Sequence, residues 1–164
     1  MRRLSLAFCG CGSRARTYAA IAAGMADRFA LVAAADPVPE RVAAIRAHTQ
    51  APGDFRSYAS AEAMFAAGRP ADVVVIGTQD AQHREHAIRA MELGCDLLLE
   101  KPIAHRLEDT LAVRDAARRL GRRHDDLDLR RRSLHELIDD GRAKADGKRI
   151  VQIGSGQRHD HVAI

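Results

Sequence analysis

The sequence has few large aromatic side chains, with no tryptophan, two tyrosines and four phenylalanines among its 164 residues. A β-sandwich core built on large rings is therefore disfavoured, because strands of that kind are enriched in aromatic residues. Alanine is abundant instead, and 46% of the residues are hydrophobic, enough for the core of one ordinary domain. This composition favours small-residue helices that pack closely on a sheet.

Cysteine is also scarce, with Cys9, Cys11 and Cys95 alone. An odd number without paired spacing excludes a disulfide framework and is typical of a reducing compartment, so we expect a cytoplasmic protein. Cys9 and Cys11 form a single C-x-C, which lacks the further ligands that a zinc site needs. The histidines are scattered, with His83 and His86 in one helical pattern and others near the end of the chain. We expect no metal site.

Long apolar runs are absent. Nothing approaches the roughly 18 residues of a membrane-spanning helix. The apolar stretch at 4–9 resembles a signal peptide, but it is shorter than the roughly 7–15 residues of such a segment and continues at once into glycines and arginines. We therefore expect neither export nor a membrane anchor.

The charge is only mildly positive, at +4. Seven arginines and three aspartates gather at 118–132, but no aromatic residue or recognition motif accompanies them, so a solvated helix end is favoured over a nucleic-acid site. The nucleic-acid alternative predicts strongly salt-dependent binding without any effect of a cofactor.

Short apolar runs alternate with helical patterns, which is typical of βα units around a parallel sheet. We therefore expect an α/β fold, a Rossmann-type doubly wound parallel sheet with a short irregular C-terminal extension. The expected strands are 4–9, 29–36, 54–58, 72–78, 96–100 and 149–153. The expected helices are 13–25, 40–48, 60–68, 81–93, 107–121 and 133–141.

A glycine fingerprint lies between the first strand and the first helix. Gly10, Gly12 and Ala15 match the pattern G-x-G-x-x-A, in which the first glycine permits a tight turn and the second lets the backbone approach a pyrophosphate. The N–H groups at the helix start, at Ser13 and Arg14, would then face the phosphates. In this strand–loop–helix context the pattern predicts dinucleotide binding.

An acidic residue at the end of the second strand strengthens this prediction. Asp36 comes 21 residues after Ala15, where a carboxylate can hydrogen-bond the hydroxyls of the adenosine ribose. The same carboxylate would repel a 2′-phosphate, so NAD is favoured over NADP. NADP stays possible, because Arg14 and Arg41 could offset the repulsion.

Four segments, "CGCGSRA", "ADP", "VVVIGTQDAQHREHA" and "LLLEKPIA", together resemble the Gfo/Idh/MocA family of nicotinamide-dependent sugar and inositol oxidoreductases. The resemblance covers residues 1–121. It implies a dinucleotide-binding Rossmann domain there and hydride transfer between nicotinamide and a polyol or sugar-like hydroxyl.

The resemblance also implies a set of cofactor-binding residues after two strands. Its most specific element is Glu100, Lys101 and Pro102, accompanied upstream by the Thr-x-(Asn/Asp)-x-x-His pattern at Thr78, Asp80 and His83. Ligands of doubly wound sheets bind at the carboxyl ends of strands, which is where these residues fall.

Individual roles follow from the same resemblance. Lys101 is the expected catalytic residue, because a partly desolvated lysine beside nicotinamide can exchange a proton with an alcohol or carbonyl. Glu100 would orient it or balance the local charge, and Gly77 and Thr78 would line the nicotinamide ribose. His83 could contact the cofactor or be a satisfied histidine at a helix start. Without the resemblance, Lys101 would be read as a solvated lysine after a strand.

The chain departs from the family beyond residue 121. Family members carry a second α/β domain that supplies most substrate contacts, whereas 122–164 would be a remnant, with the linking helix and the first strand of that second sheet. The strand that normally precedes the helix is replaced by 122–129 in this interpretation. Two possibilities stay open: an active oxidoreductase, or a truncated dinucleotide-binding module without turnover. The isolated strand at 149–153 would have unpaired edges, so 149–164 would pair with another strand, including one of a second chain by self-association, dock on the nucleotide-binding domain or be mobile.

Overall fold

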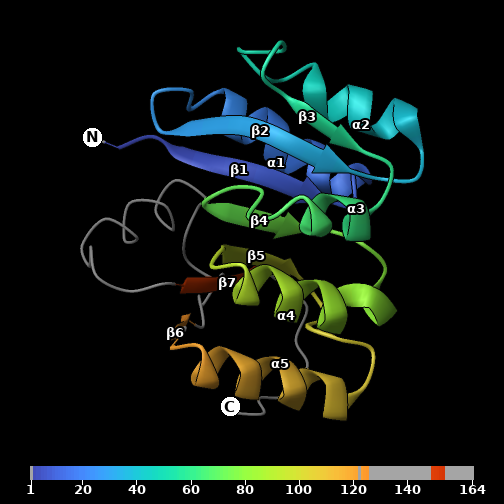
Figure 1. The fold of residues 1–164 in the computed structure, drawn as a ribbon, viewed down its shortest axis with the longest axis vertical. Coiled ribbons are helices and arrows are strands. Elements are labelled where there is room, and N and C mark those ends of the chain that lie inside the picture. The colour runs from blue at the N-terminus through green and yellow to red at the C-terminus, as the bar shows by residue number, and fades with distance from the viewer. Residues whose placement is uncertain (1, 122, 126–148, 154–164) are drawn as a thin grey trace.

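The fold is a parallel sheet covered by helices on both faces (Figure 1). It was obtained as a computed structural model, which describes residues 2–121, 123–125 and 149–153. The seven strands within these residues follow the order β3-β2-β1-β4-β5-β7-β6. They are β1 (Leu4–Cys9), β2 (Phe29–Ala35), β3 (Arg56–Tyr58), β4 (Val73–Ile76), β5 (Asp96–Glu100), β6 (Arg123–Asp125) and β7 (Arg149–Ile153).

The helices connect successive strands and begin and end at residues suited to those positions. Ser60 accepts a hydrogen bond from the N–H of Ala63 (3.2 Å) and caps its helix. Pro39 opens the helix directly before it in the chain, and Gly94, with a positive φ of 86°, follows a later helix. The helices are α1 (Ser13–Ala23), α2 (Pro39–Arg46), α3 (Ala61–Ala66), α4 (His83–Glu92) and α5 (Leu107–Arg119), with a 3₁₀ turn η1 (Asp80–Gln82) before α4.

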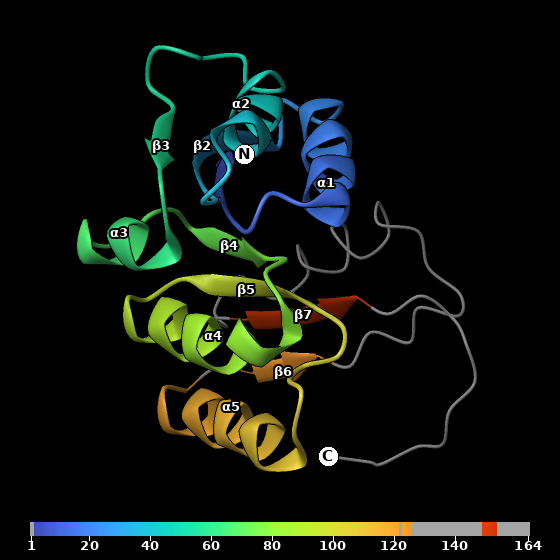
Figure 2. The ribbon, with the colours of Figure 1, turned by 90° about the vertical axis from the view of Figure 1, so that its right-hand side faces the viewer.

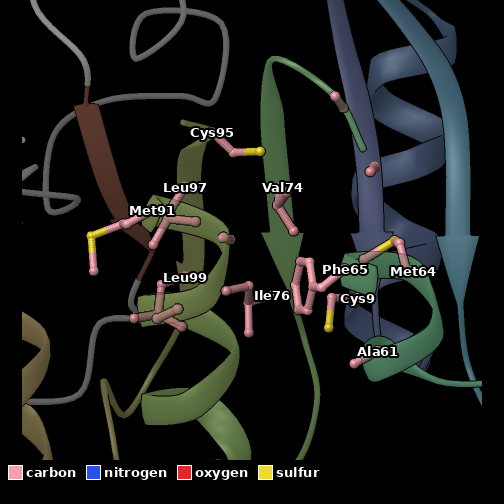
Figure 3. Packing of buried hydrophobic residues seen from close by; sticks show 14 of the residues in the cluster. Cys9, Ala61, Met64, Phe65, Val74, Ile76, Met91, Cys95, Leu97 and Leu99 are labelled. Atoms are coloured by element: carbon pink, nitrogen blue, oxygen red, sulfur yellow. The ribbon is translucent and has the colours of Figure 1, made fainter. Parts of the chain in front are cut away.

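Two hydrophobic clusters, one on each face, hold the helices to the sheet. On one face α1 and α2 pack against strand residues such as Phe8 and Val75. On the other face α3 and α4 pack against Cys9, Ile76 and Leu97 (Figures 2 and 3). Neighbouring strand residues point to opposite faces, and both faces are covered. The central strands are therefore apolar at successive positions, which is the pattern expected of a parallel sheet covered on both faces.

The predicted α/β class, the parallel sheet and the strand at 149–153 are confirmed. The strands expected at 4–9 and 96–100 also match residue for residue, the remaining described elements differ from expectation by a few residues at their ends, and the helix expected at 133–141 lies outside the described residues. No helix in the described ranges combines the length and apolarity needed to cross a bilayer.

One expectation about the end of the chain is wrong and another is met. The segment 122–129 was not expected to contain a strand, yet it contains β6, which pairs in parallel with β7. Among the outcomes expected for the strand at 149–153, docking on residues 1–121 is the one observed, because β7 pairs with β5, from Leu97 opposite Ile150 to Glu100 opposite Ile153. The physical reason is that β5 would otherwise present unpaired N–H and C=O groups at its edge.

Candidate dinucleotide site

The carboxyl ends of four strands meet at one edge of the sheet. Cys9 at the end of β1 lies opposite Ala35 of β2 on one side and Ile76 of β4 on the other, and Ile76 lies opposite Leu99 of β5. The chain leaves β1 toward β2, whereas β4 continues to β5 on the other side, so the strand order reverses between β1 and β4. This is the switch point where open α/β sheets bind ligands.

The first fingerprint glycine joins two loops at this switch point. Gly10 has φ of +83°, and a Cβ placed on it would lie 2.7 Å from the backbone of Gly77 and from the nitrogen of Thr78. The N–H of Gly77 donates to the carbonyl of Cys9 (2.9 Å). A side chain at Gly10 would both strain the backbone and push the two loops apart.

The second glycine leaves an open space in front of a helix. Gly12 is the N-cap of α1, and a Cβ built on it would meet nothing within 4 Å. Ser13 and Arg14 follow it at the exposed start of α1, where N–H groups have no partner within the helix. Ala15 is buried, and a Cβ built on Gly77 would lie 3.7 Å from the Cβ of Ala15, so the start of α1 packs closely against the loop after β4. The backbone at the start of α1 is therefore accessible to an anionic group.

Asp36 lies beside the glycine loop, but its carboxylate already has backbone partners. Its Oδ2 accepts from the N–H of Cys11 (2.9 Å) and its Oδ1 from the N–H of Val38 (2.9 Å). Arg41 lies 3.8 Å from the same Oδ1, and Asp36 is only 5% exposed. Asp36 therefore also holds the glycine loop in place through Cys11. Its distance of 21 residues from Ala15 predicted contact with the ribose but not this structural role.

The cysteines of the loop region are buried, free thiols. Burial raises the pKa of Cys11 to about 12 and that of Cys9 further, with Asp36 contributing at both. Both therefore stay protonated at neutral pH, whereas metal ligation and nucleophilic attack need the thiolate. Their role in the described fold is packing.

Glu100 is the centre of a polar cluster at the end of β5. The hydroxyl of Tyr18 donates to its Oε1, Arg14 Nε lies 3.8 Å from the same oxygen, and the backbone N–H of Lys101 donates to Oε2 (3.3 Å). Burial, followed by the hydrogen bond to Glu100, raises the pKa of Tyr18 above its usual range. The carboxylate of Glu100 therefore pairs with the guanidinium of Arg14. Its contact with Lys101 is made by the backbone N–H of that residue and not by the side-chain amine.

Tyr18 was missed in the sequence analysis. It lies four residues after Arg14, on the same face of α1, and a polar pair at that spacing can share one partner. The spacing was visible in the sequence, but the partner was not, because Glu100 is 82 positions away along the chain.

Lys101 and Asp80 are both exposed at the same edge. The partial burial that we expected for Lys101 is not provided by the part of the chain that the structure describes. The peptide bond between Lys101 and Pro102 is cis, and Pro102 is exposed as well.

His83 links two of the site's loops. It is 1% exposed, its Nδ1 lies 2.8 Å from the carbonyl oxygen of Pro102, and its Nε2 lies 3.1 Å from the carbonyl oxygen of Thr78. The geometry matches a satisfied histidine at a helix start, one of the two alternatives. It holds the loop after β4 against the loop after β5, which carries Lys101.

A groove of about 440 Å³ lies between α3 and α4. Glu62, Phe65 and His86 are among its lining residues, and none of the sequence-predicted site residues lines it. We place the candidate site at the glycine loop, because the strand ends, the open Gly12 position and the start of α1 converge there and not at the groove. His86 nevertheless reaches the site, because its Nδ1 lies 3.1 Å from the hydroxyl of Thr78.

Comparison with known proteins finds similar chains among dehydrogenases. D-glucoside 3-dehydrogenase of Escherichia coli K12 is 34% identical over 92 residues, which are 56% of this chain and 25% of the relative. The WlbA dehydrogenase of Chromobacterium violaceum, solved with NADH and UDP-GlcNAcA, is 31% identical with a TM-score of 0.65, over 73% of this chain and 33% of that one.

A scyllo-inositol dehydrogenase of Lactobacillus casei, solved with NAD(H) and scyllo-inositol, shares the fold at 18% identity and a TM-score of 0.64, over 73% of this chain and 34% of that one. The chain thus spans a quarter to a third of the length of these relatives. Residues 4–124 match the family model described as an oxidoreductase family with an NAD-binding Rossmann fold. With this match, and with the fingerprint loop at the switch point of the sheet, the chain belongs to the Gfo/Idh/MocA oxidoreductase family.

Proposed function

We propose that this chain binds NAD with the pyrophosphate against Gly10–Gly12 and the start of α1. The observation that carries the proposal is the open position at Gly12, where a Cβ would meet nothing within 4 Å, at a helix start whose N–H groups have no acceptor within the helix and can donate to a phosphate. Ser13 and Arg14 would hold the phosphates from the first turn of α1.

The adenosine ribose would lie beside Asp36. An ionised carboxylate has about four lone-pair sites, so it can accept from ribose hydroxyls while keeping its bonds to the N–H groups of Cys11 and Val38. The same charge would repel a 2′-phosphate. Arg41 reduces that repulsion, being 3.8 Å from Asp36, so we expect NAD to bind more tightly than NADP, with NADP still able to bind.

The nicotinamide end would face the loops after β4 and β5. Gly77 and Thr78 would line its ribose, Asp80 and Pro102 would border it, and His83 would keep the two loops together. Bound NAD would supply the hydride acceptor for oxidation of a substrate carbon that carries a hydroxyl. Lys101 would take the hydroxyl proton as the carbonyl forms, and Glu100 would hold the main chain of Lys101 in place.

We propose a polyol or a sugar-like molecule as the substrate. Support comes from the relatives, which are a glucoside dehydrogenase, an inositol dehydrogenase and a dehydrogenase solved with a nucleotide sugar. Because the chain spans at most about a third of these solved relatives, the activity of the whole proteins stays a proposal for this one.

Calorimetric titration with NADH tests the binding step. Gly12→Ala should weaken binding at least tenfold, because its methyl group would occupy the space proposed for the pyrophosphate, and it should leave the fold intact. Gly53→Ala is the matched control, since that Cβ also meets nothing within 4 Å but lies in the loop before β3. Equal affinity of Gly12→Ala and Gly53→Ala would refute the proposed cofactor position.

Turnover is tested separately, with inositols and glucosides as substrates and NADH absorbance as the readout. Lys101→Ala should spare NADH affinity and lower turnover about 10²- to 10⁴-fold, the usual contribution of a general acid–base group. Tight NADH binding by the unaltered chain without turnover of any substrate would instead indicate a dinucleotide-binding module.

We also propose self-association, which the sequence analysis placed at 149–164. Within the described residues β7 is paired on both sides, with β5 and with β6, so the edge that could pair with a second chain is that of β6. Light scattering over a range of protein concentrations measures it, and a strictly monomeric mass at all concentrations would contradict it.

A further inference from the structure

The hydroxyl of Thr78 is the last member of a chain of polar groups that begins on α3. Its Oγ1 lies 3.1 Å from Nδ1 of His86 on α4, and Nε2 of His86 lies 3.6 Å from Oε1 of Glu62 on α3. His86 is 4% exposed, whereas the side chain of Glu62 is 68% exposed. Of these three residues only Thr78 belongs to the cofactor-binding residues expected from the sequence.

The surroundings of His86 determine which ring nitrogen carries the proton. Burial lowers the pKa of His86, although Glu62 and Glu85 partly oppose this and His83 adds to it. Hydrogen bonding from Ser60 is the main cause that lowers the pKa of Glu62, so Glu62 is an ionised acceptor at neutral pH. A neutral imidazole has one N–H, and the Glu62 carboxylate, whose Oε1 lies 3.6 Å from Nε2, favours that proton on Nε2 by charge attraction rather than by a direct hydrogen bond.

This tautomer determines the direction of the Thr78 hydroxyl. Nδ1 of His86 has no proton and can only accept, so the single O–H of Thr78 donates to it. The lone pairs of the Thr78 oxygen then remain for a donor on the open side of the site. A ribose hydroxyl is such a donor, and a ribose hydroxyl is what the proposed NAD position would place beside the loop after β4.

We propose that His86 is a positioning residue that holds the Thr78 hydroxyl as a hydrogen-bond acceptor for the nicotinamide ribose. The proposal rests on the proposed function, because it assumes that NAD lies along this edge of the sheet. His86 itself acts only through Thr78 and lines the groove on the far side.

Two substitutions separate this role from simple packing. His86→Leu fills the site but cannot accept, so affinity for NAD should fall about three- to tenfold, the effect of one neutral hydrogen bond. His86→Asn should restore most of the affinity, because its side-chain oxygen can occupy the position of Nδ1 without titrating. Thr78→Val combined with His86→Leu should bind no more weakly than Thr78→Val alone. Equal affinities of the unaltered chain, His86→Leu and His86→Asn would overturn the proposal.

The dependence of NAD affinity on pH distinguishes a positioning role of His86 from a packing role, because packing alone would not make the affinity depend on the protonation of this residue. When His86 is protonated, its Nδ1–H donates to the oxygen of Thr78. That oxygen then has one lone pair fewer for the ribose, and its O–H points elsewhere. Affinity should therefore fall as the pH is lowered below the usual histidine range of about 6.5, and His86→Asn should lack this step. The groups that face His86 are Glu62 from α3, Glu85 and His83 from α4 and Thr78 from the loop after β4. Identical profiles in both proteins would overturn the proposal.

The tautomer can be measured without any cofactor, which distinguishes the two proposals. The ¹⁵N–¹H spectrum of the free chain at neutral pH should show His86 protonated on Nε2, and protonation on Nδ1 would overturn the positioning role alone. If the tautomer is as expected but the unaltered chain binds no NAD, the proposed function fails, and the role of His86 fails with it.

Discussion

At Gly10 the lack of a side chain lets the loop after β1 touch the loop after β4. Sequence reasoning assigned this glycine to a tight turn, and its φ of +83° confirms that need. The close approach of Gly77 is a second reason why residue 10 must be glycine. The G-x-G-x-x-A pattern does not predict it, because it depends on β1 and β4 being neighbours in the sheet.

We predict that Gly10→Ala lowers the free energy of unfolding by at least about 2 kcal/mol, because it combines left-handed strain with a backbone overlap. Gly68→Ala is the matched control: φ is +98° there, but a Cβ meets nothing within 4 Å. It should show the strain alone, about 1–2 kcal/mol. Urea denaturation measures both, and equal losses would show that the contact with Gly77 has no energetic weight.

On the scale of elements, Asp72 joins the beginning of β4 to the beginning of β1. This residue precedes β4 and accepts from the N–H (3.0 Å) and the hydroxyl (2.8 Å) of Ser5 in β1, with Arg2 and Arg69 as ion-pair partners. Its own N–H donates to the Ser5 hydroxyl (2.8 Å). Burial alone would raise the pKa of Asp72, but the hydrogen bonds from Ser5 and the two arginines outweigh it and lower the pKa.

We predict an acid-dependent loss of stability from this contact. Because the folded-state pKa of Asp72 is lowered, its contribution is complete above the unfolded value of about 3.9 and is lost as the pH falls through the folded value. Asp72→Asn should cost roughly 1–2 kcal/mol at pH 7, and the difference from the unaltered chain should shrink below about pH 4. Urea denaturation from pH 7 to pH 2 measures it, with the exposed Asp54→Asn as control. A pH-independent difference would contradict the assignment.

On the scale of the whole molecule, the sheet continues past β5 with strands from the last third of the chain. β7 pairs with β5 over four residue pairs, and β6 follows at the edge. The division into a dinucleotide-binding domain at 1–121 and a remnant at 122–164 stays a prediction, but the backbone of β7 is part of the same sheet as the candidate site.

We predict that a proline in β7 destabilises this sheet. Val151→Pro removes an N–H from the strand that lies against Leu98 and should cost about 3 kcal/mol or more. Val151→Ile keeps both the N–H and the branched side chain and serves as the control. Hydrogen exchange of the β5 amides measures the effect, and unchanged protection in Val151→Pro would show that β7 does not pair with β5 in solution.

The sequence by itself determined the order of strands and helices up to α5, the glycine loop and the acidic residue after β2. These are local properties, because apolar periodicity and turn chemistry act over a few neighbouring residues. The tertiary structure alone decided that Tyr18 meets Glu100, that Asp36 also braces the loop at Cys11, that His86 reaches Thr78 and that β7 joins the first sheet. Most of these contacts join residues far apart in the chain, and even the nearby pair of Thr78 and His86 depends on how α4 packs on β4. They follow from strand neighbours and helix packing, which no local pattern specifies.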